Sequence, residues 1–268
     1  MLLLLGGCVS APAPAALAPP LSYPPAARDR MLRLAIAEWR DWGCATTGLP
    51  GPSLMACDGV SLAGREAALE NFPRVLAYWR SVPQSGEAIP ANRARYNAAL
   101  RGEGGGNLWA EPFWSAAFIS WVIGAAGVDA PEFAPDAAHS RYLDHLDALA
   151  AAHPALAPFL PRNPAGYAPQ PGDLVCRDRS RRPLLDWSER AAERGQFRPM
   201  HCDIVVTTAS GMVEAVGGNV TDSVTLTRWA TDAEGRLLPD PAPFLVIMEN
   251  RLGRTPPFAP HPPQDTRS

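Results

Sequence analysis

The stretch Glu111-Pro-Phe-Trp-Ser-Ala-Ala-Phe-Ile-Ser-Trp-Val122 decides the fold class, because it predicts a helix that is apolar on every side. We expect this helix to run from Ser115 to Ala126 and to end at Gly127, a residue type that readily adopts the left-handed conformation of helix ends. Its large apolar residues do not keep to one face. The helix should therefore lie in the core rather than on the surface.

Several β-rich runs follow after Tyr167, separated by Gly, Pro, Asp and Asn. Runs of β-branched and apolar residues between such turn residues are typical of strands. The runs are Gly172 to Cys176, Cys202 to Thr207, Gly211 to Val216, Ser223 to Thr227 and Phe244 to Met248. A buried helix followed by an antiparallel sheet predicts an α+β fold.

The part of the chain before the buried helix is predicted to be helical. Apolar residues recur at helical spacing from Arg30 to Trp39, and the stretches 71–78 and 91–100 show a similar pattern. The glycines between Gly102 and Gly106 then break it. We therefore expect a signal and Ala/Pro-rich linker (1–28), a helical N-terminal region (29–106), an α+β domain (107–252) and a disordered Pro-rich tail (253–268).

The composition excludes some classes of function. The chain has 268 residues, of which 47% are hydrophobic, so it can bury a sizeable core. Its formal net charge of −3 gives no overall attraction to nucleic acid or to anionic lipid. No segment approaches the ~20 continuous apolar residues of a membrane-spanning helix. We expect no nucleic-acid partner.

The first residues predict a location in the cell envelope. A short apolar run from Leu2 leads into Leu5-Gly-Gly-Cys8, which resembles a bacterial lipobox. In a lipobox the cysteine becomes the lipidated first residue of the mature protein, and Val9 behind it favours the outer membrane. We expect a lipid-anchored protein that faces the periplasm. The alternative is an incidental cysteine, because the apolar run is short and no Lys or Arg precedes it.

The other cysteines favour two disulfides, because an even number in an exported protein is typical of paired cysteines. They are Cys44, Cys57, Cys176 and Cys202. The first two lie on either side of a loop that contains Gly and Pro, so we expect a bridge between them. The last two each fall in a strand-like run, where a cross-strand bridge is possible. The alternative is a set of buried free thiols.

Three later segments complete a pattern that begins with Pro112-Phe-Trp-Ser115. They are Pro171-Gly-Asp-Leu-Val175, Met200-His-Cys-Asp-Ile-Val-Val206 and Val216-Gly-Gly-Asn219. In this order they resemble segments of the CHAP-type cell-wall amidohydrolases, which share the papain-like fold. More narrowly, the chain resembles the uncharacterised bacterial family called domain of unknown function 2272, in which serine is usual where the amidohydrolases have their catalytic cysteine. The resemblance covers about residues 109–248 and implies a papain-like core with the catalytic set Ser115, His201 and Asn219.

The change from cysteine to Ser115 alters the chemistry of such a site. A papain-like site works because an imidazole and a helix N-terminus lower the pKa of a thiol until thiolate is populated. A hydroxyl must instead lose its proton to a base during attack, and His201 could accept it if Asn219 oriented the ring. Each residue also has a structural alternative: Ser115 as a helix N-cap, His201 as a buried structural histidine, and Asn219 as a turn residue.

Other residues are candidates for binding substrate: Trp114, His139, Tyr142 and Arg177. His139 and Tyr142 share a face of a helix-like stretch and can reach the cleft. Arg177 belongs to a group with Arg179, Arg181 and Arg182 at the start of a long connection, 178–199, which could grip peptide carboxylates. The alternative is a solvated, mobile loop. A metal-ligand set with standard spacing is missing, so we predict no metal and no cofactor.

The expected function is hydrolysis of an amide bond in peptidoglycan by a serine variant of the papain-like fold. The first alternative is a catalytically inactive module that holds peptidoglycan or an envelope protein in the same cleft. The second is a scaffold in an envelope complex that uses the Trp-rich N-terminal helices. Fold analogy alone does not separate these functions.

Overall fold

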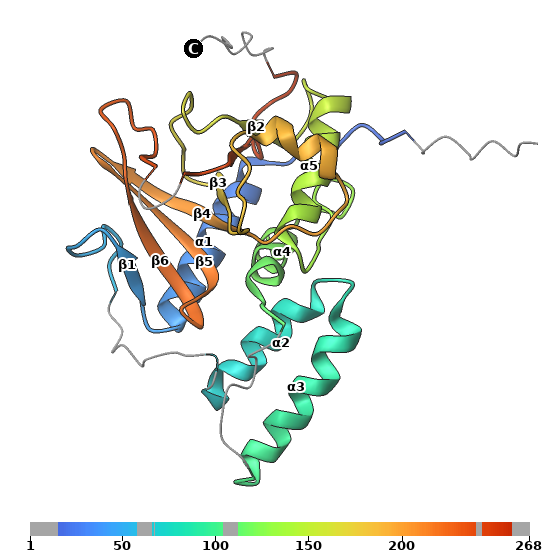
Figure 1. Ribbon diagram of the computed structural model, residues 1–268, viewed down its shortest axis with the longest axis vertical. Helices are drawn as coiled ribbons and strands as arrows, with labels where there is room; N and C mark the ends of the chain where they lie inside the picture. Colours follow the sequence, from blue (N-terminus) through green and yellow to red (C-terminus); the bar gives the residue numbers. More distant parts are fainter. Residues whose placement is uncertain (1–15, 58–65, 67, 104–111, 240–242, 259–268) are drawn as a thin grey trace, which may run out of the picture.

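The computed structural model describes residues 16–57, 66, 68–103, 112–239 and 243–258, which form helices packed on a single sheet (Figure 1). Cys8 and the apolar run before it lie outside the described residues. So do glycines 104–106 and most of the Pro-rich tail. The predictions of a lipobox and of a disordered tail end therefore concern parts of the chain on which the structure gives no information.

The helices predicted from the sequence are present. The N-terminal part contains α1 (Pro25–Asp41), the short 3₁₀ helix η1 (Leu69–Asn71), α2 (Phe72–Arg80) and α3 (Ser85–Leu100). The predicted buried helix is α4 (Ser115–Ala125), and Gly127 behind it has a left-handed φ of 92°. The later helices are α5 (His139–Ala152) and the 3₁₀ helix η2 (Trp187–Glu193).

The strands form one sheet in the order β1-β6-β5-β4-β3-β7-β2. They are β1 (Thr46–Gly48), β2 (Phe159–Arg162), β3 (Leu174–Asp178), β4 (Met200–Ala209), β5 (Met212–Val220), β6 (Ser223–Ala230) and β7 (Val246–Asn250). The predicted α+β class is confirmed. The sheet is mixed rather than purely antiparallel, because the edge strand β1 pairs in parallel with β6.

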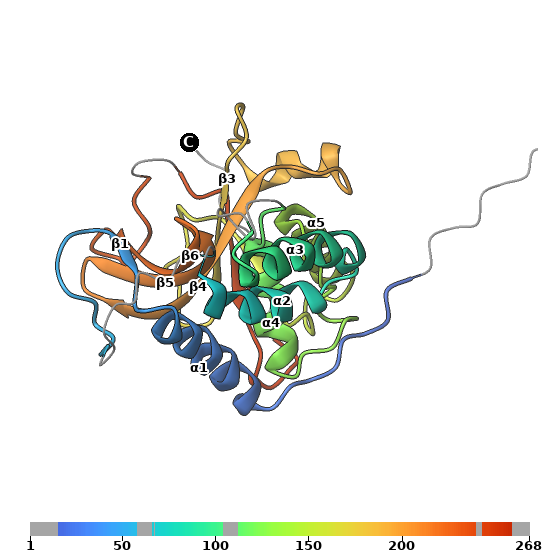
Figure 2. The ribbon, with the colours of Figure 1, turned by 90° about the horizontal axis from the view of Figure 1, so that it is seen from below.

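Helix α4 lies in the middle of the core. Its residues Phe118, Ile119, Val122 and Ile123 are fully buried. The helix contacts β4 and β5 of the sheet as well as α1 and α2, and Figure 2 shows these helices gathered beside the strands. A helix that is apolar on all sides is stable only when it is enclosed in this way.

The N-terminal helices and the sheet share one core. A continuous cluster of buried apolar residues runs from Met31 in α1 to Leu252 after β7. Part of the predicted linker is also docked on this body. The carboxylate of Glu132 accepts hydrogen bonds from the backbone N–H of Leu21 at 2.8 Å and from the hydroxyl of Tyr23 at 2.9 Å.

Both expected disulfides are present. Cys44 is bonded to Cys57 across the loop behind α1, and Cys176 is bonded to Cys202. The second bridge is cross-strand, since Cys176 of β3 lies opposite Cys202 of β4. It therefore ties β3 to β4, the strand that carries His201. The alternative of free thiols is excluded for these four cysteines.

Candidate functional site

A cavity of about 510 Å³ opens where α4 begins. Its wall includes Ser115 of α4, His139 of α5, His201 of β4 and Asn219 of β5. Pockets of ~300–1,000 Å³ are the usual size for binding small molecules and short peptide segments. The three residues that the sequence resemblance selected as a catalytic set thus face the same cavity, although they are far apart in the chain.

Ser115 is the first residue of α4, and its hydroxyl is the strongest candidate for a nucleophile in the cavity. Its Oγ lies 2.8 Å from Nε2 of His139 and forms a hydrogen bond with it. The first N–H groups of a helix have no partner within the helix and carry a partial positive charge. Ser115 therefore combines a hydroxyl bonded to an imidazole with backbone donors that can stabilise a nearby anion.

His139 is held from its other side by Tyr142, one helical turn further along α5. Its Nδ1 forms a short hydrogen bond with the Tyr142 hydroxyl, which is fully buried. Burial lowers the pKa of His139 well below its usual value, and electrostatic interaction with His201 and with Arg179 lowers it further. Burial raises the pKa of Tyr142 well above its usual value, and the Asp203 carboxylate adds to this. At neutral pH both side chains are therefore uncharged, and the imidazole can accept a proton.

His201 forms a second pair with Asp203 on the same strand. Nε2 of His201 lies 3.0 Å from Oδ1 of Asp203, and both side chains are buried. The His201 ring packs edge-on to the His139 ring, with 5.4 Å between the ring centres. The cavity wall thus holds two imidazoles with different electrostatic partners, a phenol for one and a carboxylate for the other.

Glycines in β5 make room for this pair. Strand β5 pairs with β4 only as far as Ile204 and Val216, and beyond that point it continues along β6 alone. A Cβ atom on Gly217 would lie 1.8 Å from Oδ1 of Asp203, and one on Gly218 would lie 2.5 Å from Cβ of Phe118 in α4. The two glycines therefore allow β5 to approach both the His201–Asp203 pair and the start of α4.

Asn219 lines the cavity from a backbone conformation that few residue types adopt. Its φ is 56°, in the left-handed region that Asn tolerates better than most residues. Thr221 and Asp222, which form the following turn, also have positive φ angles of 51° and 61°. Backbone strain of this kind is found preferentially at functional sites. Within the described residues no hydrogen bond is formed by the Asn219 side chain.

The structure thus brings the predicted residues together but pairs them differently. We expected His201 beside Ser115 and Asn219 on the other nitrogen of the ring. Ser115 instead bonds to His139, and the carboxylate that orients His201 is Asp203. Asp203 was not selected from the sequence, although the i, i+2 spacing of His201 and Asp203 places both side chains on one face of a strand.

Three of the predicted substrate-binding residues do not line the cavity: Tyr142 is fully buried behind His139, and Trp114 and Arg177 lie away from it. Trp114 is fully buried, donates its indole N–H to Glu66 at 2.8 Å and stacks on Trp42. The guanidinium of Arg177 lies 4.2 Å from the ring centre of Trp229, in the smaller apolar cluster on the second face of the sheet. The side chains of Trp114 and Arg177 are used in packing, so the roles predicted for these two residues are not supported by their positions. His139, which was grouped with them, is instead the partner of Ser115.

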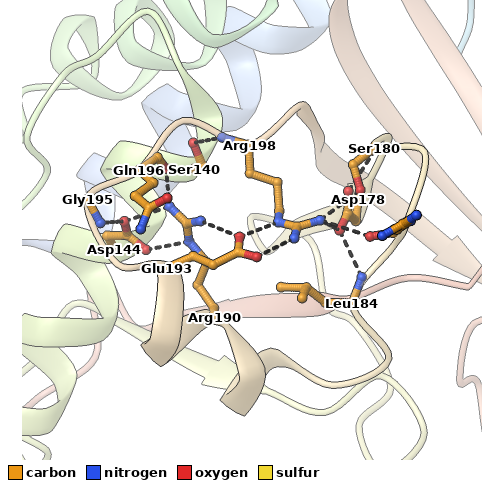
Figure 3. A network of polar contacts seen from close by, with 11 residues as sticks. Ser140, Asp144, Asp178, Ser180, Leu184, Arg190, Glu193, Gly195, Gln196 and Arg198 are labelled. Atoms are coloured by element: carbon orange, nitrogen blue, oxygen red, sulfur yellow. Dashed lines mark hydrogen bonds and ion pairs between the residues drawn. The ribbon is translucent and has the colours of Figure 1, made fainter.

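The long connection between β3 and β4 forms one wall of the cavity and is fastened to α5. Figure 3 shows the network that holds it: Arg190 of η2 donates to both carboxylate oxygens of Asp144 at 2.9 Å, and Arg198 donates to Asp178 and to Glu193. Arg190 is 2% exposed, so its charge is neutralised inside the protein. The expectation of a solvated, mobile loop is not met by this network.

Groups of three or more His, Cys, Asp or Glu residues that could hold a metal ion are not found in the described part of the chain. A helix long and apolar enough to cross a membrane is likewise not found there.

The model of a bacterial family described as "uncharacterized protein conserved in bacteria" (DUF2272) matches residues 68–251. The chain belongs to this family. In this DUF2272 protein the matched region begins just before η1, ends after β7 and contains every cavity residue named above. No curated protein and no solved structure matches the chain. The narrower of the two resemblances seen in the sequence is thus confirmed, and the wider resemblance to CHAP-type amidohydrolases remains a prediction.

Proposed function

We propose that this protein is a serine-dependent hydrolase of amide bonds, with Ser115 as the nucleophile and His139 as the base. The observation that carries the proposal is the 2.8 Å hydrogen bond between Ser115 Oγ and His139 Nε2 at the wall of an open cavity. A nucleophile within hydrogen-bond reach of a base, which a third group orients, is the arrangement that nucleophilic catalysis requires. Here the third group is Tyr142.

The proposed reaction follows the logic of other serine hydrolases. The Ser115 oxygen attacks the carbonyl carbon of the amide while its proton passes to Nε2 of His139, which needs the tautomer whose Nδ1–H donates to the Tyr142 oxygen. The N–H groups at the start of α4 stabilise the oxyanion. His139 then gives the proton to the leaving nitrogen, the C–N bond breaks, and water hydrolyses the acyl-enzyme.

Catalysis by Ser115, His139 and Tyr142 should be slower than catalysis by a triad in which an aspartate takes the place of the tyrosine. Tyr142 is uncharged and therefore orients the His139 ring without neutralising the imidazolium that forms during attack. The lowered pKa of His139 has a compensating effect, since the ring stays deprotonated, and so able to act as a base, below the ordinary histidine pKa of ~6.5. We expect the acidic limb of the pH–activity profile to lie below that value.

The proposed substrate is a peptide of the cell wall, acted on from the periplasmic side of the outer membrane. The support is the resemblance of four segments to the CHAP-type amidohydrolases, together with the lipobox-like Leu5-Gly-Gly-Cys8. A papain-like arrangement, with the nucleophile at the start of a buried helix and a histidine on a neighbouring strand, is compatible with the positions of Ser115 and His201.

The proposal is tested by incubating the purified protein with peptidoglycan and analysing released fragments by mass spectrometry. We expect Ser115→Ala and His139→Ala each to lose nearly all activity. The two residues act as a unit, so removing either one removes the activity of the pair. His201→Ala should retain a measurable part of it. Thermal unfolding of each variant checks that the fold is kept. Loss in His201→Ala with activity in His139→Ala would make His201 the base instead, and activity in all three variants would refute the proposal.

A catalytically silent binding module is the second candidate, and one observation favours it. Ser115 stands where the CHAP-type amidohydrolases, which the chain resembles, carry a thiol, and its partner His139 is bonded to a phenol rather than to a carboxylate. Such a module would bind peptidoglycan fragments without releasing products, and Ser115→Ala would bind them as well as the unchanged protein. Sedimentation of the protein with insoluble peptidoglycan, measured beside the hydrolysis assay, separates the two functions.

A further inference from the structure

The β3–β4 connection contains six arginines, and three of them are paired with acidic residues. Arg190 is paired with Asp144, Arg194 with Asp147, and Arg198 with Asp178 and Glu193. These charges are neutralised within the protein. Arg190 and Arg194 fasten the connection to α5, and Arg198 ties two parts of the connection together. Figure 3 shows the pairs of Arg190 and Arg198.

Of the three arginines without such a partner in the described structure, Arg179 alone lines the cavity. It lies next to Asp178 at the start of the connection, its side chain is exposed, and it lines the cavity together with Ser115 and His139. Its backbone N–H is bonded to Pro199, but its guanidinium has no hydrogen-bond or ion-pair partner among the described residues. The neighbouring carboxylate of Asp178 is already occupied by Arg198 and by the backbone N–H groups of Ser180 and Leu184.

The charge of Arg179 acts close to the proposed catalytic pair. It is one of the positive charges that lower the pKa of His139, after burial and after His201. An anion bound to Arg179 would therefore sit beside Ser115 and His139. The acidic residue that lines the cavity, Asp222, forms no ion pair with Arg179 in the described structure, so it does not occupy this position.

The cavity also has an apolar rim. Phe113 and Phe197 line it, yet they are 73% and 66% exposed, which makes them two of the most exposed large apolar side chains described. Exposed aromatic rings on two segments that line one cavity are suited to contact an apolar part of a ligand.

We propose that Arg179 binds a carboxylate of the substrate, so that the cavity selects amides that carry a negative charge close to the bond to be cut and an apolar group beside it. The planar guanidinium matches a carboxylate with two parallel hydrogen bonds, which a lysine cannot reproduce. The inference rests on the proposed function only for the cleavage step, because recognition of the carboxylate does not require turnover.

The test measures binding in a Ser115→Ala background, where hydrolysis is removed. The probes are N-acetyl-alanyl-alanine in its L,L and D,D forms, each compared with its C-terminal carboxamide, by NMR titration at low ionic strength. We expect at least one carboxylate form to bind tenfold or more tightly than its carboxamide. Adding Arg179→Gln should remove this preference, and Arg179→Lys should restore only part of it.

Arg181→Gln is the matched control. It removes the same charge from the same connection, but Arg181 does not line the cavity, so the preference should persist. Equal affinity for carboxylate and carboxamide, loss of the preference in Arg181→Gln, or no binding of either probe up to its solubility limit would overturn the inference. Carboxylate-selective binding by a protein that hydrolyses nothing would leave the inference standing and refute the proposed hydrolase.

Discussion

The His201–Asp203 pair depends on a single glycine. A Cβ atom on Gly217 would lie 1.8 Å from Oδ1 of Asp203 and 3.0 Å from Nε2 of His201, and the first distance is far inside van der Waals contact. The strand cannot easily shift, because β6 pairs with Gly217 through Thr225. A larger residue would therefore displace the carboxylate from the imidazole.

We predict that Gly217→Ala separates Asp203 from His201 and costs about 1–3 kcal/mol of unfolding free energy, the usual range for overpacking. NMR chemical shifts of the His201 ring should differ from those of the unchanged protein, since the ring loses the hydrogen bond to its carboxylate partner. Gly124→Ala in α4 is the control: nothing lies within 4 Å of its added Cβ, so stability should be unchanged or slightly higher. Unaltered chemical shifts of the His201 ring in Gly217→Ala would contradict this account.

At this scale the sequence predicts which residues meet but not which atoms bond. The segment order placed Ser115, His201 and Asn219 at one cavity, as observed. The partner of Ser115 depends on how α5 packs against α4, a relation between two elements for which no motif exists. His139 was noted only because it shares a helix face with Tyr142, and that shared face is what the His139–Tyr142 hydrogen bond uses.

Among the secondary-structure elements, the ends of β3 and β7 are joined by one buried carboxylate. Oδ1 of Asp173 accepts the backbone N–H of Asn250, and Oδ2 accepts the N–H of Gln170 and the hydroxyl of Tyr167. Burial is the largest influence on this group and raises the pKa of Asp173 to about 6, although these hydrogen bonds oppose the change. The folded state therefore holds the Asp173 proton more tightly than the unfolded chain does.

A raised carboxyl pKa stabilises the fold fully below the unfolded pKa of ~3.9, and this stabilisation is lost as pH rises through the folded value of about 6. The loss between pH 4 and 7 is on the order of 2 kcal/mol. We predict that Asp173→Asn, which cannot titrate, has a flatter dependence of unfolding free energy on pH. Urea unfolding at several pH values measures it. A variant with the same slope as the unchanged protein would show that Asp173 does not titrate in this range.

The elements missed from the sequence are short or held by distant contacts. Strands β1 and β2 have three and four residues, and β2 contains Pro161 and lies at an edge of the sheet, where a strand tolerates proline. Neither offers a run long enough to show alternation. The β3–β4 connection looks polar and mobile because its order comes from the ion pair of Arg190 with Asp144, 46 residues earlier in the chain.

For the whole molecule, the core extends beyond the region that the family model matches. That region begins at residue 68, whereas α1 and β1 precede it. Met31 and Trp39 of α1 are buried in the same apolar cluster as the sheet, and β1 adds a strand to its edge. The N-terminal helices are thus part of the folded body that carries the cavity.

The proposed lipid anchor at Cys8 concerns the location of the whole molecule. Expressed with its complete leader, the protein should be recovered with membranes, and Cys8→Ala should move it to the soluble fraction, because a lipid attached at this cysteine is the proposed means of attachment. Ser10→Ala, two residues away, should stay with membranes. Unchanged membrane recovery of Cys8→Ala would reject the lipoprotein proposal.

The docking of the N-terminal segment sets how far the cavity can stand from such a membrane. Within the described residues, which begin at 16, the first bond to the body is at Leu17, whose carbonyl oxygen is 2.8 Å from Nε2 of His153. A fully extended chain spans ~3.3–3.6 Å per residue, so the stretch from Cys8 to Leu17 reaches at most about 30 Å. With so short a tether, an anchored molecule would sample only a thin layer next to the bilayer. Only substrate within that layer would reach the cavity. Substrate further from the bilayer would not be used, however high its concentration.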